Sequence, residues 1–425
     1  MRSRIFAAEW VLPVVTEQIR DGAVVVEAGR VAWLGPLAHL PKTWSSFPIE
    51  QYPGVLTPGL VNAHTHLQYT HFDEVGRGVY SSFENWSDAF GVVYDEVTDP
   101  ETWRQAALDG ARQAIASGTT VFAEIVTNDE ARGALAACGV TGIEYLEAIG
   151  QFGHTWQNGG RDEFLARLEQ SSAVPSGVSP HAPYSLDGSV ITDLVGIAAK
   201  RQLRVHSHVG ESAVEANLYL RGDNSVLSAY GDLRDEFELV RKGGSGHTTA
   251  GYSDAVGLLN PNTHLAHAIY LDREERDLLL ARGTQVALCP RSNAVIGLAP
   301  PPVAAYLDEG HEIAVGTDSL ASSPSMDLMA DVALLARIAR AQGYTGDDLY
   351  RRLIRAATTG GALAMGIAEV GYGALEVGGP ADLAVFDVSV RSNSVEQDLV
   401  EQGEGRCTLT ISGGQVLHDA STVRR

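Results

Sequence analysis

The chain has 425 residues and carries 53 acidic against 31 basic side chains, which gives a formal net charge of −22. This charge argues against nucleic acid or an anionic membrane as a partner, and no run of about 18 apolar residues predicts a transmembrane helix. Residues 1–6 lack the apolar stretch of a signal peptide. The three cysteines are too widely spaced to predict a disulfide framework, so we expect a cytoplasmic protein with reduced thiols.

Both ends of the chain have the pattern of short β-strands. Residues 23–34 read as two strands joined by a turn that contains glycine. Residues 381–387 and 407–414 repeat this pattern with a Gly-Gly turn. We expect residues 1–54 and 367–425 to pair into one small, discontinuous β-sandwich domain.

Between the two ends, strand-like and helix-like segments alternate. The eight predicted strands lie at residues 55–63, 119–126, 140–149, 176–181, 203–209, 263–269, 285–290 and 312–318. Amphipathic helices are predicted at residues 101–117, 187–201, 272–281 and 326–342. Eight strand–helix units predict an α/β fold, a (β/α)8 TIM-type barrel over residues 55–366. A doubly wound sheet is the alternative, but no phosphate-cradling glycine motif opens a helix.

One insertion breaks this alternation. Residues 222–262 are polar and glycine-rich, with a predicted helix at residues 232–241. Long loops in compact domains are often functional lids or disordered segments. We expect this insertion to be a lid or a wall of the substrate pocket, at the carboxyl-terminal face of the barrel.

The first predicted barrel strand ends in two histidines. Side chains two residues apart on a strand point to the same side, so His64 and His66 can present both imidazoles to one point. Neutral imidazole suits zinc, iron, nickel or copper. Taken alone, the pair is equally compatible with two histidines in a turn.

Further polar side chains follow other predicted strands. Catalytic groups of TIM barrels lie at the carboxyl ends of the strands, and the groups found there are His181, His208, Glu211, His267 and Asp318. His206 lies on the same strand face as His208, and we expect it one layer deeper as a hydrogen-bonded barrel residue. His264 and His267 differ in strand parity, so we expect only one of them to face inward.

In this order and spacing, the motifs resemble those of the amidohydrolase superfamily. The matching segments are residues 58–66, 180–184, 208–212, 265–267, 289–293 and 316–319. The His-x-x-Glu spacing of His208 and Glu211 is similar to that of the aminohydrolase branch. The resemblance implies that Glu211 and His267 move protons and that one divalent metal, zinc or iron, is bound by His64, His66, His208 and Asp318.

The lysines give an independent argument for one metal. Superfamily members with two metals generally bridge them by a carboxylated lysine on the fourth or third strand, and Lys42, Lys200 and Lys242, the only lysines, do not lie near those strands. Three imidazoles and a carboxylate leave a position for water, whose pKa a metal can lower to about 7. Together with this water, the resemblance to the aminohydrolase branch implies hydrolysis of a C–N bond in a cyclic amidine. Glu211 would protonate the ring, and Asp318 and His267 would carry a proton to the leaving ammonia.

The substrate is less clearly indicated by the residues. The motifs are most similar to those of aminodeoxyfutalosine deaminases, which implies conversion of 6-amino-6-deoxyfutalosine to futalosine in menaquinone biosynthesis. The expected substrate contacts are His181 with the ring, Arg291 with a carboxylate, Asp95 with ribose hydroxyls, and Asn293. For Arg291 a surface ion pair is an equal alternative, and for Asp95 a solvated helix residue is the favoured alternative.

Several alternatives remain open. Within the same class they are methylthioadenosine/adenosylhomocysteine-type deaminases, guanine deaminases and triazine hydrolases. No arginine is evident in the predicted third strand (residues 143–147) to bind an amino-acid carboxylate, which disfavours adenosylhomocysteine. An amide or peptide hydrolase and a non-catalytic barrel scaffold are disfavoured, because the metal-ligand pattern is complete. We expect a small-molecule substrate and a homodimer.

Overall fold

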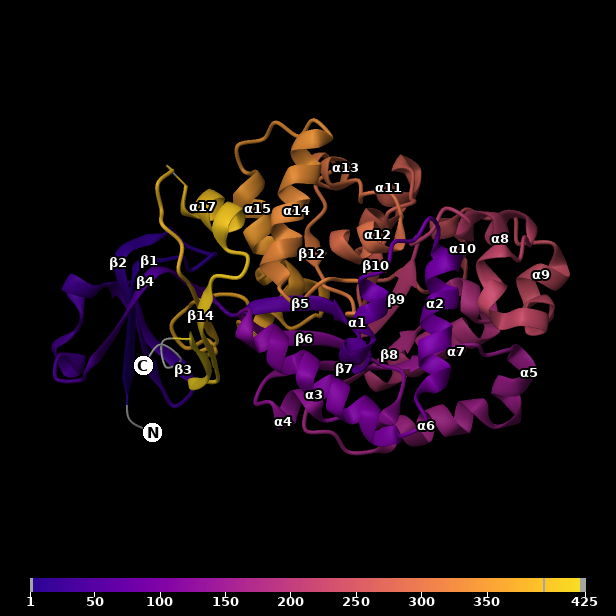
Figure 1. Ribbon diagram of the computed structural model, residues 1–425, viewed down its shortest axis with the longest axis horizontal. Helices are drawn as coiled ribbons and strands as arrows, with labels where there is room; N and C mark the ends of the chain where they lie inside the picture. The colour runs from indigo at the N-terminus through magenta and orange to yellow at the C-terminus, as the bar shows by residue number, and fades with distance from the viewer. Residues whose placement is uncertain (1–2, 393, 421–425) are drawn as a thin grey trace.

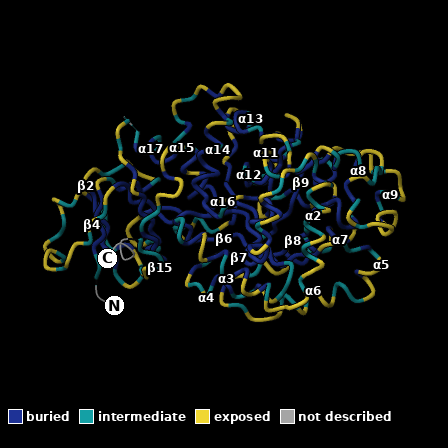
Figure 2. The backbone as a smooth tube through the Cα atoms, viewed as in Figure 1, coloured by how far each residue is buried: buried dark blue, intermediate teal, exposed yellow. Residues whose placement is uncertain are grey.

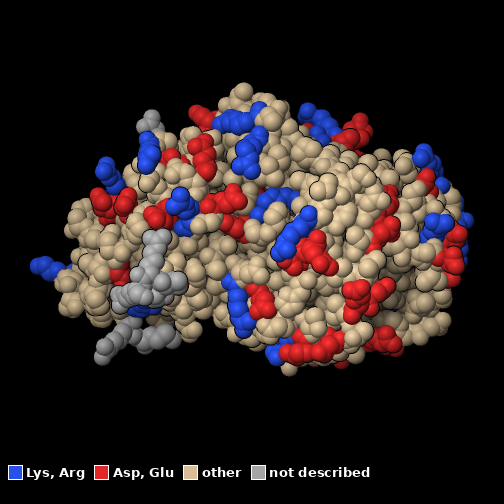
Figure 3. Space-filling view, in the orientation of Figure 1, with Lys and Arg blue, Asp and Glu red and all other residues tan. Residues whose placement is uncertain are grey.

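The computed structural model describes residues 3–392 and 394–420, which form one eight-stranded and one seven-stranded sheet. Figure 1 shows the seven-stranded sheet at one end of the molecule, and the helices α2 (Phe83–Glu96), α8 (Glu215–Arg221) and α9 (Glu238–Lys242) at the other. None of the helices in the described residues is long and apolar enough to cross a lipid bilayer. On the face drawn in Figure 3, basic side chains are scattered among acidic ones rather than gathered in one patch.

The eight-stranded sheet is a parallel barrel whose strands follow one another in chain order. Asp318 N donates to His64 O at 3.0 Å, and this bridge joins the last strand to the first. The prediction of a (β/α)8 barrel is confirmed. Its strands are β5 (Leu60–Thr65), β6 (Thr119–Val126), β7 (Thr141–Ala148), β8 (Ser176–Pro180), β9 (Val205–Val209), β10 (Thr263–His267), β11 (Gln285–Leu288) and β12 (Ile313–Val315).

One predicted strand is divided in the structure. The segment predicted at residues 55–63 contains the end of β4 (Ile49–Pro58), which belongs to the seven-stranded sheet, and the start of β5. Gly59 lies between them, and a Cβ atom there would come within 2.2 Å of Thr120 Oγ1. A side chain at this position would collide with β6, so glycine allows the chain to pass directly from one sheet to the other.

Helices cover the outside of the barrel. The four predicted amphipathic helices are confirmed as α3 (Pro100–Ala116), α7 (Gly188–Arg201), α11 (Arg273–Arg282) and α14 (Leu328–Ala341). Asp99 and Asp272 cap the amino ends of α3 and α11 by accepting backbone N–H groups. Such caps satisfy donors that have no partner within the helix.

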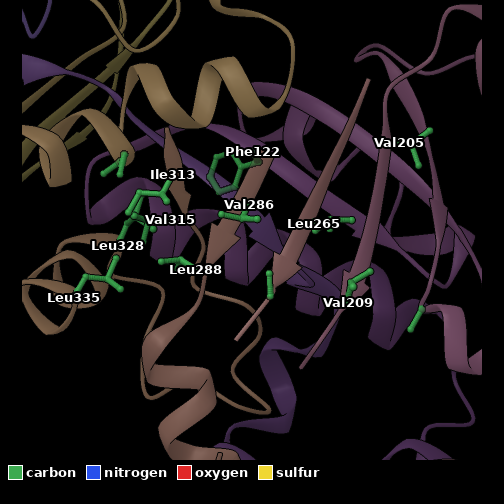
Figure 4. Close-up of a cluster of buried hydrophobic side chains, with 14 of the residues drawn as sticks. Phe122, Val205, Val209, Leu265, Val286, Leu288, Ile313, Val315, Leu328 and Leu335 are labelled. Atoms are coloured by element: carbon green, nitrogen blue, oxygen red, sulfur yellow. The ribbon is translucent and has the colours of Figure 1, made fainter. Parts of the chain in front are cut away.

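Alternate strand residues pack on the two sides of the barrel wall, as the period of two requires. Outward side chains of the strands and residues of α14 form the apolar cluster drawn in Figure 4, which includes Val286, Leu288, Ile313 and Val315 with Leu328 and Leu335 of α14. Inside the barrel, small side chains allow α16 (Thr359–Ala364) to pack against β5, β11 and β12. Figure 2 shows the strands running through the buried interior and the exposed residues at the periphery. These small side chains, Ala63, Ala287 and Ala314 of the strands, cluster with Ala364 of α16.

The two ends of the chain share the seven-stranded sheet, as predicted. In it, β13 (Leu383–Phe386) pairs with β4, with Leu383 opposite Pro58. The order of strands is β15 (Gln415–Asp419), β14 (Cys407–Ser412), β13, β4, β1 (Arg4–Val11), β2 (Ile19–Glu27) and β3 (Arg30–Pro36). Backbone bonds of Val31 to Gly378 and Gly379, at 2.8 and 3.0 Å, bring the β3 edge back to the segment before β13. The sheet therefore curls over its own apolar core.

The insertion at residues 222–262 is folded in the structure. It contains the 3₁₀ helix η7 (Ser225–Glu236), then α9 and α10 (Thr249–Ala255). The helix predicted at residues 232–241 is interrupted at Phe237, whose backbone is extended (φ −62°, ψ 137°). The Phe237 ring is buried against Phe152, with centroids 4.8 Å apart, at the break between η7 and α9.

Candidate active site

The carboxyl ends of the barrel strands surround a cavity of about 430 Å³. Polar side chains of the strand ends line one part of it: His66, Glu147, His181, His208, Glu211 and Asp318. The rest of the lining is mainly aromatic and comes largely from α2 and η7, with Phe83, Trp86, Phe90, Tyr94, Tyr69, Tyr184 and Tyr230. Among the described residues, no lysine or arginine lines the cavity.

The structure brings the four predicted metal ligands together at the ends of β5, β9 and β12. His66 Nε2 and His208 Nε2 lie 3.2 Å apart. Asp318 Oδ1 is 3.6 Å from His64 Nε2 and 4.0 Å from His66 Nε2. All four side chains are buried.

The chemistry of this set fits a divalent metal. His64 Nε2 is buried and has no hydrogen-bond partner among the described residues. Burial, and then the neighbouring His206 and His208, hold the pKa of His64 well below its usual range, so its ring is neutral. Buried polar atoms are normally paired, and neutral imidazoles beside a carboxylate are ligands of zinc and iron. A metal between these groups would supply the partner that His64 lacks.

Hydrogen bonds behind the ligands orient their rings. His208 Nδ1 lies 2.8 Å from the backbone oxygen of His181, which can only accept, so Nδ1 carries the proton and Nε2 is left for the metal. His206 Nε2 lies 3.1 Å from His64 Nδ1 and the His206 side chain is buried in the barrel. His206 is therefore one layer deeper than the ligands, as predicted.

Asp318 is held in an unusual backbone conformation. Its φ of +58° lies in the left-handed region, which non-glycine residues rarely adopt. Oδ2 accepts from the hydroxyls of Ser292 at 2.7 Å and Ser322 at 3.0 Å, and Oδ1 accepts from Ser319 N at 2.8 Å. These donors fix the carboxylate toward the histidines.

Both His264 and His267 face inward, so the prediction that only one would do so is wrong. His264 Nε2 lies 3.1 Å from Ala63 O inside the barrel. His267 has a φ of +69° and Ala268 a φ of +47°, and this left-handed turn ends the strand alternation on which the prediction rested. The His267 ring then points to Glu211, with Nε2 3.5 Å from Oε1.

Glu211 is placed beside the metal ligands as a buried acid. Burial, then Asp318 and Glu215, raise the pKa of Glu211 well above its usual range. Glu215 accepts from the backbone N–H groups of Gly210 at 2.9 Å and Ser212 at 2.8 Å. These bonds fix the loop on which Glu211 lies.

The predicted substrate contacts have different outcomes. His181 lines the cavity, and its Nδ1 lies 2.8 Å from Ser185 Oγ. Asn293 does not line the cavity; its Nδ2 lies 3.3 Å from His267 Nδ1 and supports that ring instead. Asp95 is exposed on α2 and does not line the cavity either.

Arg291 is also placed away from the cavity. Its Nη2 lies 2.7 Å from Asp331 Oδ2, and Asp331 is fully buried. The guanidinium also donates to Ser325 Oγ and to the backbone oxygens of Ser325 and Asp327. With these partners Arg291 forms a structural ion pair with Asp331 outside the cavity, and the expectation that it meets a substrate carboxylate is corrected.

Some residues of the site were not predicted. Glu147 and Thr127 line the cavity from the ends of neighbouring strands, and Tyr230 lines it from η7. Glu147 could have been predicted, because it is an acidic residue near the end of the third predicted strand, and strand ends carry the catalytic groups of this fold. No local pattern distinguishes Tyr230 from other aromatic residues of the insertion.

Comparisons with known proteins agree with this architecture. A family model described as "Amidohydrolase family" matches residues 55–417. A 5-methylthioadenosine/S-adenosylhomocysteine deaminase of Nitratidesulfovibrio vulgaris is 28% identical, over 94% of this chain and 88% of that protein. An adenosine deaminase structure from Xanthomonas campestris, with bound zinc, has a TM-score of 0.81 and 23% identity, covering 98% of this chain and 93% of that chain. The Helicobacter pylori aminofutalosine deaminase has a TM-score of 0.77 and 18% identity, covering 98% and 100%.

Proposed function

Since this chain belongs to the amidohydrolase family, we propose that it is a metal-dependent hydrolytic deaminase of an adenosine-type nucleoside. The chain is a hydrolase that acts on C–N bonds in cyclic amidines. The observation that carries the proposal is the position of Glu211, a buried acid that faces His267 at 3.5 Å beside the three histidines and Asp318. An acid next to a metal-ligand set is what removal of an amino group from an electron-poor ring needs.

The residues of the site have separate tasks in this reaction. A divalent metal held by His64, His66, His208 and Asp318, zinc or iron, would lower the pKa of a water to about 7. Glu211 donates its proton to a ring nitrogen. Burial lowers the pKa of His267 to about 3, so its ring is neutral. Asn293 Nδ2 donates to His267 Nδ1 at 3.3 Å, so Nε2 carries the proton and can hydrogen-bond the reacting water, while Asp318 would take the proton of that water and pass it to the departing amine.

Within this class we propose 6-amino-6-deoxyfutalosine as the substrate and futalosine as the product, a step of menaquinone biosynthesis. The aromatic lining supports it, because adenine and a benzoate ring are two ring systems that can pack against Trp86, Phe90 and Tyr230. The benzoate carboxylate would lie at the mouth of the cavity, since none of the described lining residues is a lysine or arginine. A homodimer and a cytoplasmic location remain predictions.

5′-Methylthioadenosine is the second candidate. The Nitratidesulfovibrio vulgaris relative is named for it, and its small uncharged substituent suits a cavity without a cation. S-adenosylhomocysteine is less favoured, because its amino-acid tail has no ring to pack against the aromatic lining, and none of the described lining residues is a lysine or arginine that could bind its carboxylate.

Ammonia release tests the proposal. The metal-loaded protein is incubated with 6-amino-6-deoxyfutalosine, 5′-methylthioadenosine, S-adenosylhomocysteine and adenosine, and with guanine and an aminotriazine. We expect ammonia from the nucleosides and the highest kcat/KM for 6-amino-6-deoxyfutalosine. A highest value for 5′-methylthioadenosine would reassign the substrate, and turnover of guanine or the triazine alone would overturn the nucleoside proposal.

A further inference from the structure

Glu147 is a buried acid of the cavity that the reaction described above does not use. It lies near the end of β7, and its side chain is only 3% exposed. Thr127 Oγ1 donates to its Oε2 at 2.6 Å. Its Oε1 is buried and has no hydrogen-bond partner among the described residues.

This arrangement is unfavourable without a ligand. Leaving a carboxyl oxygen buried and unpaired is costly, and such atoms in folded proteins call for an explanation. The nearest guanidinium does not provide a partner, because Arg167 Nη1 donates to the backbone oxygen of Glu147 at 2.8 Å. Burial raises the pKa of Glu147 to about 7. The carboxyl group is thus built into the cavity wall with one oxygen left to accept.

Its neighbours identify which part of the cavity it serves. Nitrogen or oxygen atoms of Glu147, His181 and His208 all lie within 4.8 Å of one another. Glu147 is grouped with His181 and His208. Glu211 is instead paired with His267, at 3.5 Å. A bound substrate can therefore meet Glu147 and Glu211 at two different positions.

The chemistry of an adenosine-type substrate limits what Glu147 can accept. Such a nucleoside has two kinds of hydrogen-bond donor, the 6-amino group and the sugar hydroxyls. The amino group must lie at the metal with Glu211 and His267, since it is the group that leaves. We propose that Glu147 Oε1 binds a ribose hydroxyl of the substrate, an inference that rests on the proposed function. This is the role expected from the sequence for Asp95, which is exposed outside the cavity.

Deoxynucleosides separate this contact from other roles of Glu147. The values of kcat/KM are measured for 5′-methylthioadenosine and its 2′-deoxy and 3′-deoxy analogues, with wild type, Glu147→Gln and Glu147→Ala. Glu130→Gln, an exposed glutamate, is the matched control. Loss of a hydrogen bond to a charged group corresponds to a decrease of about 10- to 100-fold in kcat/KM. We expect Glu147→Ala to lose that factor on the ribonucleoside but not on one of the deoxy analogues, and Glu147→Gln, which keeps an acceptor oxygen, to lose less.

The same experiment separates two kinds of failure. An equal loss on the ribonucleoside and on both deoxy analogues would overturn the assignment of Glu147 while leaving the deaminase proposal intact. Absence of ammonia from every nucleoside, with turnover of guanine or a triazine, would overturn the proposed function and the Glu147 assignment with it. Dissociation constants of 5′-methylthioinosine and its deoxy analogues give a second readout, in which Glu147→Ala should weaken only the ribonucleoside.

Discussion

His206 places its Nε2 3.1 Å from Nδ1 of His64, with the two rings within 7° of parallel. His206 in turn packs edge-on against His264, with ring centroids 4.4 Å apart. His64, the proposed metal ligand, is therefore supported by two further buried histidines, and its Nε2 lies 3.6 Å from Asp318 Oδ1.

Replacement of His206 should weaken metal binding. We expect His206→Phe to lower the metal affinity about 10- to 100-fold, because a group that orients a ligand histidine has an effect of this size. Competition with a chromophoric chelator measures it. His206→Asn, whose amide can still reach His64, should retain more affinity than His206→Phe, and unchanged affinity in both variants would contradict the role assigned to His206.

Replacement of Glu211 should separate catalysis from metal binding. Glu211→Gln keeps the size of the side chain but removes the acidic proton, so we expect kcat to fall about 10²- to 10⁴-fold. Metal content should stay at the wild-type level. Ammonia release and elemental analysis measure the two quantities, with Glu130→Gln as the control. Near-normal turnover of Glu211→Gln would remove Glu211 from the reaction.

Metal content and metal removal test the ligand set. We expect about one zinc or iron per chain, because the site offers one set of three imidazoles and a carboxylate. Chelation should abolish ammonia release and lower the Tm, since a ligand that binds only the folded state stabilises it. Ammonia release and the original Tm should return when the metal is restored. Two metals per chain would overturn the mononuclear prediction.

Replacement of Arg291 tests whether it is structural. Asp331 is fully buried, so Arg291→Met leaves an unpaired carboxylate, and we expect a loss of about 3–5 kcal/mol in the free energy of unfolding. The double variant Arg291→Met/Asp331→Asn should recover much of this loss. Urea denaturation measures the change. An unchanged stability together with a large rise in KM for carboxylate-bearing substrates would instead place Arg291 at the substrate.

Asp382 should make stability depend on pH. Burial raises the pKa of Asp382 to about 6, although its Oδ1 accepts from Gly413 N at 2.7 Å. An unfolded aspartate has a pKa near 4, so between about pH 4 and 6 the folded state binds more protons. The stability contributed by Asp382 is therefore present below pH 4 and is lost as the pH rises through 6.

The matched variant for this prediction is Asp382→Asn. As the pH rises from about 4 to 6, the free energy of unfolding of wild type should fall relative to that of Asp382→Asn, by up to about 1.4 kcal/mol per pH unit. Denaturant titrations of both proteins at several pH values measure the difference, which cancels the titration of other groups. A difference that does not change with pH would contradict a raised pKa for Asp382.

Much of the fold was predictable because the strands are short apolar segments separated by helices of amphipathic pattern. The positions of His64, His66 and His208 at strand ends follow from the same pattern, since parallel strands in a barrel end at one face. Side-chain direction was harder to predict where the backbone leaves the extended region. His267 and Asp318 both have left-handed φ values, and strand parity does not apply there.

Partners distant in sequence could not be predicted. Arg291 is paired with Asp331 across 40 positions, and nothing in the residues around Arg291 distinguishes that partner from a substrate carboxylate. The same applies to Asp95, whose exposure depends on how α2 packs over the cavity. These are consequences of tertiary packing rather than of local pattern.

The pairing of β4 with β13 has a consequence for the order of folding. Thr57 and Ala384, opposite each other in this pair, are 327 positions apart. At about 5–20 residues per second, β13 is synthesised roughly 15–65 s after β4. Until then the edge of β4 that pairs with β13 is free, while its other edge is paired with β1 of the antiparallel strands β1, β2 and β3. A free strand edge can pair with another chain. The seven-stranded sheet is therefore completed only after the barrel has been synthesised, and aggregation during translation is expected to begin at β4.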